Sequence, residues 1–405
     1  MPQKTTTMKT QFITKLILVS ITIGFGLASC NNDGCTDPDA NNYDEKAKND
    51  DGSCEYDAPD TRLSGDITED LTLDSSYEYT LAGGVHVKSG VTLTIPAGTM
   101  IQSDPNESVA YLLVEQGGKI DARGTDTEPI VFTSGSASPA AGDWGGIIIC
   151  GKAPINNGTT ATAEVGDVLY GGPDPADNSG ALEYVRVEYT GNAINDEKEH
   201  NGFTFNGVGS GTTLSYLQAY FGNDDGFEFF GGTVSADYLV SSGSGDDSFD
   251  WTYGWVGSGS YWIAEQAAGV GDRGIEADNN GDNNGATPSS NPTLSNITLT
   301  GHSASESDGI KLREGTMANI SNVVISRFQD GVEIEHEITV SNAANGNLTL
   351  ENITLEYITE SAFAIKGAES SIDSTSAANM VDMAIGTNAT GAGSDWTIGW
   401  TKALN

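Results

Sequence analysis

The segment DGFEF at residues 225–229 is followed 22 residues later by DSFDW at residues 247–251, and the two align without a gap. Five further segments fit the same frame: NGFTF (201–205), RGIEA (273–277), DGIKL (308–312), DGVEI (330–334) and SAFAI (361–365). The second position is small, the third and fifth are mostly apolar, and the fourth is polar in all but the last segment. This alternation predicts one short β-strand in each repeat, with the third and fifth side chains in the core.

A second set of segments supplies another strand for successive repeats. It consists of LSNITL (294–299), ISNVVI (320–325) and LENITL (350–355), and the sequence contains no long amphipathic helix pattern. A period near 22 residues, with parallel strands stacked about 4.8 Å apart, is typical of a right-handed parallel β-helix. The sequence therefore predicts an all-β, single-stranded solenoid. At one of its corners, three residues of these segments are expected to form a ladder: Asn296, Asn322 and Asn352.

Repeats at the front of this region carry a family resemblance. TLTIPAGT (92–99) and GKIDARGT (118–125) repeat with a 26-residue offset, and EPIVFTS (128–134) and GDWGGI (142–147) follow them. These repeats resemble right-handed β-helix lipoproteins of Bacteroidetes, within the broader pectate-lyase-like group. The resemblance covers nearly all of the predicted domain, residues 63–405, and it implies the fold. It implies no single function, because stacked coils carry lyases, hydrolases, adhesins and inert stalks.

The first 29 residues are predicted to be a lipoprotein signal peptide. Lys9 and Lys15 precede the apolar run LILVSITIGFGL (16–27), which is too short to span a membrane. The LASC that follows resembles a bacterial lipobox, which implies cleavage before Cys30 and lipidation of that residue. Asn31, in place of an aspartate, favours the outer membrane, at either its cell-surface or its periplasmic face. An ordinary signal peptide followed by a chance cysteine is the alternative.

Residues 30–62 are expected to hold the lipidated cysteine, a small acidic module and a linker. An oxidising compartment favours a disulfide between Cys35 and Cys54, which leaves Cys150 as a buried thiol. The segment DGCTDPDANNYDEKAKNDDGSCEY (33–56) resembles the short acidic repeats of Bacteroidetes surface proteins, which are similar to thrombospondin type 3 calcium repeats. The side chains expected to bind calcium are Asp37, Asp39, Asn41, Asp50 and Asp51. A solvated acidic linker held by the disulfide is the alternative.

Acidic residues dominate the chain, with 57 Asp and Glu against 18 Lys and Arg and a net charge of −39. This charge excludes most nucleic-acid interactions, which need clustered Lys and Arg. Between residues 201 and 310 there are fourteen acids and a single base, Arg273. The outward fourth position of successive repeats reads Thr204, Glu228, Asp250, Glu276, Lys311, Glu333 and Ala364. Carboxylates about 5 Å apart on neighbouring coils raise each other's pKa unless a cation lies between them.

Bound calcium is the simplest way to stabilise such a face, because stacked coils supply rigid oxygen ligands. The expected ligands are Asp224, Glu228, Asp250, Glu276, Asp278 and Asp282. The function expected from these features is that of a lipid-anchored outer-membrane or cell-surface protein. It would present a rigid, calcium-stabilised acidic β-helix to a glycan or to another surface component.

An enzymatic interpretation starts from NDDGFEF (223–229) and GDDSFDW (245–251), which lie one coil apart. They are similar to polygalacturonase-type glycoside hydrolases, and the resemblance implies that Asp225, Asp246 and Asp247 are catalytic. The sequence departs from that family in two ways: the next coil lacks the expected histidine, and the expected Arg-x-Lys occurs only in reversed order. The alternative function is therefore a polysaccharide-degrading enzyme that uses residues 224–250.

Lys311 and Arg313 are the bases available to a calcium-assisted polysaccharide lyase, the other catalytic option. The competing interpretation places both in cross-coil ion pairs, Lys311 with Glu276 and Glu333, and Arg313 with Glu335. We favour the ion pairs, because a strongly paired lysine stays protonated and makes a poor base.

Aromatic residues gather just after the acidic strands. Trp251 falls in the apolar fifth position and is expected in the core, whereas Tyr253 and Trp255 are expected to stack against a sugar beside the acids. Packing of Tyr253 and Trp255 in the core or under a loop is the alternative. The four histidines show no metal-binding spacing and receive no role.

Overall fold

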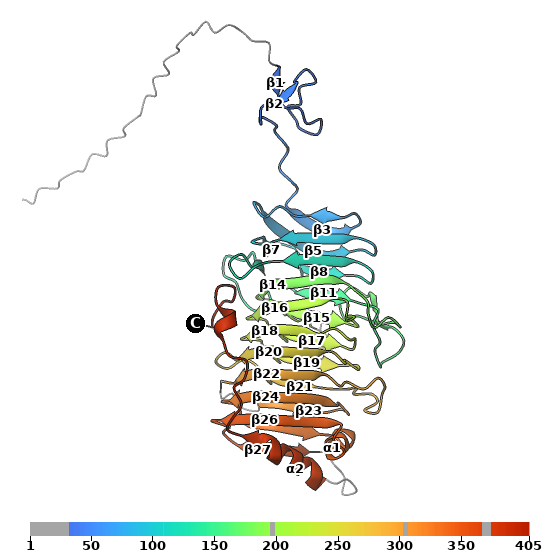
Figure 1. Ribbon diagram of the computed structural model, residues 1–405, viewed down its shortest axis with the longest axis vertical. Coiled ribbons are helices and arrows are strands. Elements are labelled where there is room, and N and C mark those ends of the chain that lie inside the picture. Colours follow the sequence, from blue (N-terminus) through green and yellow to red (C-terminus); the bar gives the residue numbers. More distant parts are fainter. Residues whose placement is uncertain (1–31, 108, 195–198, 303–306, 367–373, 405) are drawn as a thin grey trace, which may run out of the picture. The chain divides into compact units, whose positions relative to one another are not determined.

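The computed structural model describes residues 32–107, 109–194, 199–302, 307–366 and 374–404 (Figure 1). The chain divides into a first unit that ends at Pro59 and a second that begins at Asp60. The predicted signal peptide and Cys30 lie outside the described residues.

The first unit is small and is held by a disulfide. Strand β1 (Asp33–Gly34) pairs in parallel with β2 (Asn49–Asp50), and the predicted Cys35–Cys54 disulfide is confirmed. Its aspartates close turns: Asp37 Oδ1 accepts a hydrogen bond from the Asp39 N–H, 3.0 Å away. A cross-link and such side-chain-to-backbone bonds replace a large apolar core in a unit of this size.

The second unit is a parallel β-helix whose first face contains the repeat found in the sequence. Each strand of this face pairs in parallel with its equivalent in the next coil. In chain order the strands are β8 (Tyr111–Val114), β11 (Ile147–Cys150), β15 (Phe203–Asn206), β17 (Phe227–Phe230), β19 (Phe249–Thr252), β21 (Ile275–Ala277), β23 (Asp308–Leu312), β25 (Asp330–Glu335) and β27 (Ser361–Lys366).

A second series of strands, most of them longer, forms the rest of each coil. They are β9 (Lys119–Arg123), β14 (Gly180–Glu188), β16 (Thr213–Tyr220), β18 (Ala236–Ser242), β20 (Ser258–Glu265), β22 (Thr293–Thr300), β24 (Ala318–Ser326), β26 (Leu348–Glu356) and β28 (Ile385–Gly386). The opening strands are β3 (Arg62–Ile67), β4 (Leu71–Thr72), β5 (Glu78–Val87), β6 (Thr92–Pro96), β7 (Met100–Ser103) and β10 (Ile130–Ser134). An insertion between β11 and β14 holds a hairpin of β12 (Ala161–Thr162) and β13 (Leu169–Tyr170).

The core confirms the predicted register. Phe203, Phe227 and Phe249 occupy the third position of consecutive repeats, are fully buried, and stack with ring centroids 5.1 and 5.5 Å apart. The fourth positions pair from Thr204 to Ala364 in the order that the alignment predicts. The predicted buried thiol of Cys150 is also confirmed, and burial raises its pKa to about 12.

Each long strand from β14 to β26 bends at a residue with positive φ. In the last three coils this residue is Asn296, Asn322 or Asn352, and the predicted asparagine ladder is confirmed. Asn322 Nδ2 donates to Asn296 Oδ1 at 2.7 Å, and Asn352 Nδ2 donates to Asn322 Oδ1 at 3.3 Å. Asparagine suits this position because its short side chain tolerates the left-handed conformation.

Four tyrosines continue the asparagine column toward the N-terminus, which the sequence did not predict. They are Tyr184, Tyr216, Tyr238 and Tyr261, with φ between 53° and 63°. The left-handed conformation costs an ordinary residue roughly 1–2 kcal/mol. Stacking offsets this cost: the Tyr184 and Tyr216 ring centroids lie 4.2 Å apart, and those of Tyr216 and Tyr238 lie 4.3 Å apart.

The C-terminal residues first cover the last coil and then run back along the helix. Helices α1 (Glu337–Ala344) and α2 (Ser374–Ala384) lie at the end of the stack, and Val381 of α2 is buried in the core. Residues 387–404, which we call the C-terminal strap, include a short 3₁₀ helix, η1 (Asp395–Thr397). The strap donates hydrogen bonds to Thr354, Asn322, Thr298 and Gln218, which lie on successively earlier coils.

Trp396 and Trp400 attach the strap to the tyrosine column, and the Trp396 ring meets that of Tyr238 edge-on with centroids 5.3 Å apart. Trp400 is fully buried and meets the rings of Tyr184 and Tyr216 edge-on, with centroids 5.8 and 6.0 Å apart. The Trp400 carbonyl oxygen also accepts a hydrogen bond from Arg186 Nη1 at 2.6 Å. The strap thus shields one row of stacked rings from solvent.

Replacing Trp400→Ala should lower the free energy of unfolding by about 3–5 kcal/mol, the usual cost of emptying a buried aromatic site. Limited proteolysis should then cleave within the strap. The control Ile398→Ala changes a side chain in the strap that is 74% exposed, and its effect should stay within about 0.5 kcal/mol. Equal stability of the two variants in chemical denaturation would contradict a structural role for the strap.

Candidate functional site

Two columns of charged side chains follow the first face, and together we call them the acidic face. The turn column holds the first residue of each repeat: Asp225, Asp247, Arg273, Asp308 and Asp330. The strand column holds the fourth residue: Glu228, Asp250, Glu276, Lys311 and Glu333. The carboxylates of successive coils therefore lie above one another, as the sequence predicts.

The small second residue of each repeat lets the turns of successive coils approach closely. A Cβ on Gly202 would lie 2.5 Å from the carbonyl oxygen of Gly226 in the next coil. A Cβ on Gly309 would lie 2.6 Å from the carbonyl oxygen of Gly331. Both distances are too short for a Cβ atom, so only glycine allows successive turns to lie this close together.

Two of the three predicted catalytic aspartates support the turns. Asp225 and Asp247 are 7% and 2% exposed. Asp225 Oδ1 accepts a hydrogen bond from the Asp247 N–H at 2.9 Å, and Asp247 Oδ1 accepts one from the Arg273 N–H at 2.7 Å. Asp246 is exposed. A carboxylate oxygen of Asp246 lies within 4.8 Å of one from Asp225, and one from Asp247 lies equally near to Asp246. The three side chains are thus close together, but Asp225 and Asp247 are buried and bonded to backbone amides instead of facing an open groove, which a hydrolytic role would require.

Cationic side chains neutralise the C-terminal half of the acidic face. Arg273 Nη1 lies 2.7 Å from Asp272 and 2.8 Å from Glu276. Arg313 Nε pairs with Asp278 at 2.9 Å, and Arg313 also pairs with Glu276. Glu276 and Asp278, which were both predicted to bind metal, are thus ion-paired with arginines.

The expected partners of Lys311 and Arg313 are correct only in part. Lys311 pairs with Glu333 at 3.1 Å as predicted, but its second partner is Glu335 at 3.4 Å. The prediction that Arg313 pairs with Glu335 is wrong, because the Arg313 side chain turns back toward the preceding coil and meets Glu276. Glu333 is fully buried and also pairs with Lys366.

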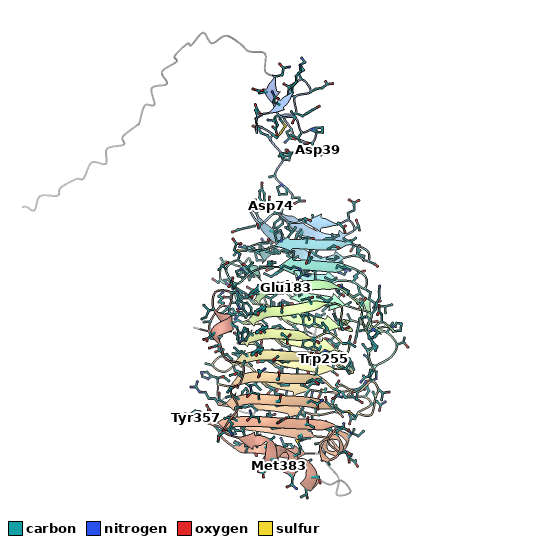
Figure 2. The ribbon with its side chains drawn as sticks, in the orientation of Figure 1. Asp39, Asp74, Glu183, Trp255, Tyr357 and Met383 are labelled. Carbon is teal, nitrogen blue, oxygen red and sulfur yellow. A yellow bond between two sulfur atoms is a disulfide. The ribbon has the colours of Figure 1, made fainter. Side chains whose placement is uncertain are left out.

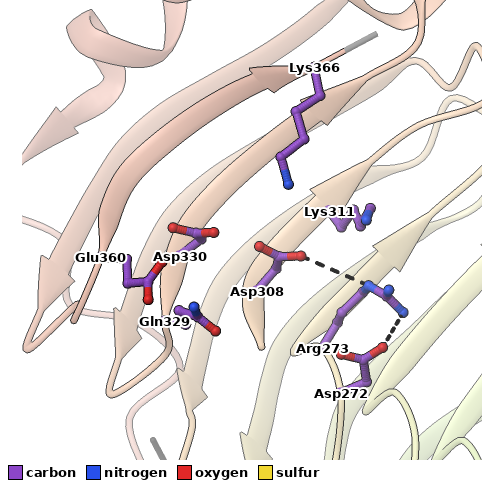
Figure 3. A pocket seen from close by; sticks show the side chains of 8 residues that line it. All are labelled: Asp272, Arg273, Asp308, Lys311, Gln329, Asp330, Glu360 and Lys366. Carbon is purple, nitrogen blue, oxygen red and sulfur yellow. Dashed lines mark ion pairs between the residues drawn. The ribbon is translucent and has the colours of Figure 1, made fainter. Parts of the chain in front are cut away.

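A pocket of about 390 Å³ opens beside this half of the acidic face (Figure 3). Asp308, Asp330, Arg273, Lys311 and Lys366 contribute to its walls. Burial raises the pKa of Asp308 to about 6, and the nearby Glu333 adds to the effect. All three cations are ion-paired, so the pocket offers charge for binding but no free base.

The N-terminal half of the acidic face holds carboxylates that no described lysine or arginine neutralises. Carboxylate oxygens of Asp225, Glu228 and Asp250 lie within 4.8 Å of one another, and so do those of Asp224, Asp225 and Asp246. We call these five residues the uncompensated cluster. None of them takes part in an ion pair with a described lysine or arginine.

Burial and mutual repulsion make the uncompensated cluster costly when it is ionised. Asp250 Oδ1 is closed off from solvent and lacks a hydrogen-bond partner among the described residues. Burial raises the pKa of Asp250 well above its ordinary value, and the charge of Glu228 adds to the effect. Burial likewise raises the pKa of Asp224 to about 8, with Glu199 and Asp246 contributing. The Asn201 side-chain amide donates to Glu228 and partly offsets this cost.

The other residues predicted to bind metal are placed apart from these clusters. Asp282 is exposed on its loop. Asp37, Asp39, Asn41, Asp50 and Asp51 lie in the first unit, where several of them accept hydrogen bonds from turn amides. All four groups of three clustered carboxylates found among the described residues belong to the β-helix. Calcium binding by the first unit stays a prediction.

The predicted aromatic platform is not at the surface. Trp255 is fully buried, its ring stacks on Phe229 at 4.2 Å, and its Nε1 donates to the Val234 carbonyl oxygen at 3.0 Å. Trp255 (Figure 2) therefore belongs to the core. Trp251, which was predicted to lie in the core, is buried there as well. Tyr253 is half-buried against Phe230.

Sequence reasoning missed a group of polar aromatic residues on earlier coils. His86 and Tyr111 are hydrogen-bonded at 3.1 Å, and the rings of Tyr111 and His200 have centroids 5.4 Å apart. The only sequence signal is that His86 and Tyr111 are 25 residues apart, about one coil.

Comparisons with known proteins identify one family. A family model described as a pectate-lyase-like β-helix domain matches residues 65–401. No curated protein and no solved structure matches the chain. Among the residues that the structure describes, no helix has the length and apolar character needed to cross a membrane.

Replacing Arg273→Met should destabilise the β-helix by about 3–5 kcal/mol, because it leaves buried carboxylates without their cation. The control Arg123→Met removes an ion-paired arginine that is 51% exposed and should cost less than about 1 kcal/mol. Urea denaturation measures both variants. Equal costs would show that Arg273 does not compensate the acidic face.

Proposed function

Because the chain belongs to the family of pectate-lyase-like β-helix domains, we propose that it is a polysaccharide-related surface protein with a calcium-stabilised acidic face. A lipid on Cys30 would anchor it in the outer membrane, at the cell surface or at the periplasmic face. The family supports a polysaccharide-related role and no finer one. The acidic face would bind a glycan or another surface component.

The uncompensated cluster carries the calcium part of this proposal. Asp225, Glu228 and Asp250 offer several carboxylate oxygens around one centre, and oxygen-only ligand sets suit calcium. The strands that carry them are held in register by the adjacent coils, so the ligand positions are rigid. Asp250 Oδ1, which lacks a hydrogen-bond partner among the described residues, is one oxygen for a cation to bind.

The two halves of the acidic face differ in how their carboxylates are neutralised. In the C-terminal half, Arg273, Lys311 and Arg313 occupy the positions between carboxylates. The N-terminal half repeats the same columns, and there the described residues supply no side-chain cation. Protonation or a bound metal ion must therefore replace that cation, and at neutral pH the metal ion leaves more of the carboxylates ionised.

The mixed charge of the pocket in Figure 3 supports glycan binding. Arg273 and Lys366 offer positive charge to an acidic sugar, while Asp308 and Asp330 accept hydrogen bonds from hydroxyl groups. The same pocket is the observation that favours an enzyme as the second candidate. A polygalacturonase-like hydrolase or a calcium-assisted lyase is less well supported, because Asp225 and Asp247 are buried and Lys311 is ion-paired.

Calcium should stabilise the protein at pH 8. A free calcium concentration of a hundred times Kd adds about 2.7 kcal/mol, which raises Tm by about 4 °C for a domain of this size. Without calcium, the free energy of unfolding should fall as the pH rises from about 4 to 8. The pKa of Asp224 is raised to about 8 in the folded protein, so the folded protein keeps this proton at pH values at which the unfolded protein has already lost it. Differential scanning calorimetry with and without chelator measures both effects.

The variant Asp250→Asn separates these effects from general salt stabilisation. Removing one buried charge should stabilise the calcium-free protein at pH 8 and abolish most of the calcium response. The matched control Asp382→Asn changes an exposed carboxylate on α2 and should leave the response intact. A calcium response that is unchanged in Asp250→Asn, or absent from the parent protein, would refute the site.

A panel of acidic and neutral polysaccharides tests the rest of the proposal. We expect calcium-dependent retardation of the protein in gels that contain acidic polysaccharides, without new reducing ends or unsaturated products. Product formation that is lost in Asp247→Asn, with folding checked by circular dichroism, would establish the enzymatic alternative instead.

A further inference from the structure

A second cavity, of about 470 Å³, lies between β5, β8 and the insertion that carries β12 and β13. We call it the Tyr111 cavity, because Tyr111 of β8 lines it beside Gly84 of β5 and Gly166 of the turn between β12 and β13. Its volume falls within the range of small-molecule sites, about 300–1,000 Å³. Its described walls share no residue with those of the pocket in Figure 3.

Two hydrogen bonds join a carboxylate, an imidazole and the Tyr111 phenol in a row. His86 Nδ1 lies 3.0 Å from Glu115 Oε1, and His86 Nε2 lies 3.1 Å from Tyr111 Oη. Lys88 Nζ donates to the same Glu115 oxygen at 2.6 Å. Burial favours the protonated form of Glu115, but the hydrogen bonds from Lys88 and His86 outweigh it and lower the pKa of this carboxyl. An ionised carboxylate only accepts, so Nδ1 donates and Nε2 is left to accept the hydrogen of the phenol.

This order of groups is that of a catalytic triad, in which a carboxylate orients a base and the base contacts an oxygen nucleophile. Burial raises the pKa of the Tyr111 phenol, and the charge of Asp167 adds to the effect. The phenol is therefore protonated at rest and needs a base that removes its proton as the oxygen attacks. His86 Nε2 lies where this base is required.

Two glycines leave the phenol oxygen open to the cavity. A Cβ on Gly84 would lie 2.5 Å from Tyr111 Oη, and one on Gly166 would lie 3.7 Å from it. Larger residues at these positions would crowd the oxygen. Val109 and Ile194 also line the cavity and offer apolar contact to an acyl group.

The position of the base favours acyl transfer over glycoside cleavage. Retaining glycosidases usually hold a second carboxyl group about 5–5.5 Å from the nucleophile, where it protonates the leaving oxygen. Here His86 contacts the nucleophile directly. The proton that it takes can therefore be returned to a leaving alcohol at the same carbonyl carbon, as in triad hydrolases.

We propose that Tyr111 is the nucleophile of an esterase for small acyl esters, with His86 as its base and Glu115 as a positioning residue. Tyr111 Oη attacks the carbonyl carbon while its proton passes to His86 Nε2, and the alcohol leaves with that proton as its bond to carbon breaks. Water then attacks the acyl-tyrosine and gives a proton to His86, from which the phenol regains it as the acid departs. This activity uses neither the proposed calcium site nor the pocket in Figure 3.

Release of p-nitrophenol from three substrates tests the proposal: p-nitrophenyl acetate, p-nitrophenyl phosphate and p-nitrophenyl β-glucoside. The buffer contains EDTA, so that failure of the calcium site leaves the result unchanged. We expect release from the acetate alone. After an acid quench, mass spectrometry should find one acetyl group on the peptide that contains Tyr111. The protein is the full chain without its signal peptide, with the substitution Cys30→Ser.

Three variants assign the roles. Tyr111→Phe and His86→Gln should each lower kcat/KM for the acetate at least about a hundredfold, the usual size of a general acid–base contribution. Glu115→Gln should lower kcat and leave KM unchanged, because orienting the base affects the transition state and not substrate binding. The control Tyr357→Phe changes a tyrosine that is 78% exposed near the other end of the helix and should react like the parent (Figure 2).

Four results would overturn the proposal. They are no release from the acetate, release that Tyr111→Phe leaves unchanged, an acetyl group found on other residues but not on Tyr111, and faster release from the phosphate or the glucoside than from the acetate. A higher KM with unchanged kcat in Glu115→Gln would overturn its positioning role. Circular dichroism checks the folding of each variant, and if Tyr111→Phe does not fold, the acetyl group on the parent protein decides.

Discussion

Parallel stacking of coils at a spacing of about 4.8 Å is the constraint on which the rest of the structure depends. It places the same position of every repeat in one column, so each side chain has its equivalents directly above and below. For Phe203 and Phe227 this is favourable, because identical rings stack. For Glu228 and Asp250 it is costly, because like charges are held together at a distance that neither can increase.

The protein resolves this conflict differently in different columns. Where a cation follows carboxylates, as Lys311 follows Glu276, the column alternates in charge. Where the backbone itself is strained, as at Tyr216 and Asn322, stacking or amide hydrogen bonds between neighbours compensate. In the uncompensated cluster no described lysine or arginine performs this task, and the Asn201 amide offsets only part of the cost. This contrast makes the cluster the candidate site.

The repeat made the fold predictable, because its strand period and its apolar third and fifth positions decide both register and core. It also predicted which carboxylates would lie above one another. The burial of Trp255 could not be predicted from the repeat, because this residue lies in a turn where the alternation no longer indicates which side faces the core. The partners of Arg313 were missed because a long side chain can reach a neighbouring coil in either direction. His86 and Tyr111 come from the paired strands β5 and β8, and no shared motif in the sequence indicates their contact.

The C-terminal strap has a consequence for the order of folding. Most contacts in a solenoid join neighbouring coils, so such a chain can form progressively from its N-terminal end. Here the bond from Arg186 to Trp400 joins residues 214 positions apart, and Lys402 closes the same distance to Glu188. The central coils therefore stay without part of their cover until the last residues have emerged. The fold is therefore completed only after the strap has been synthesised. Because the strap contacts several coils, it couples their folding.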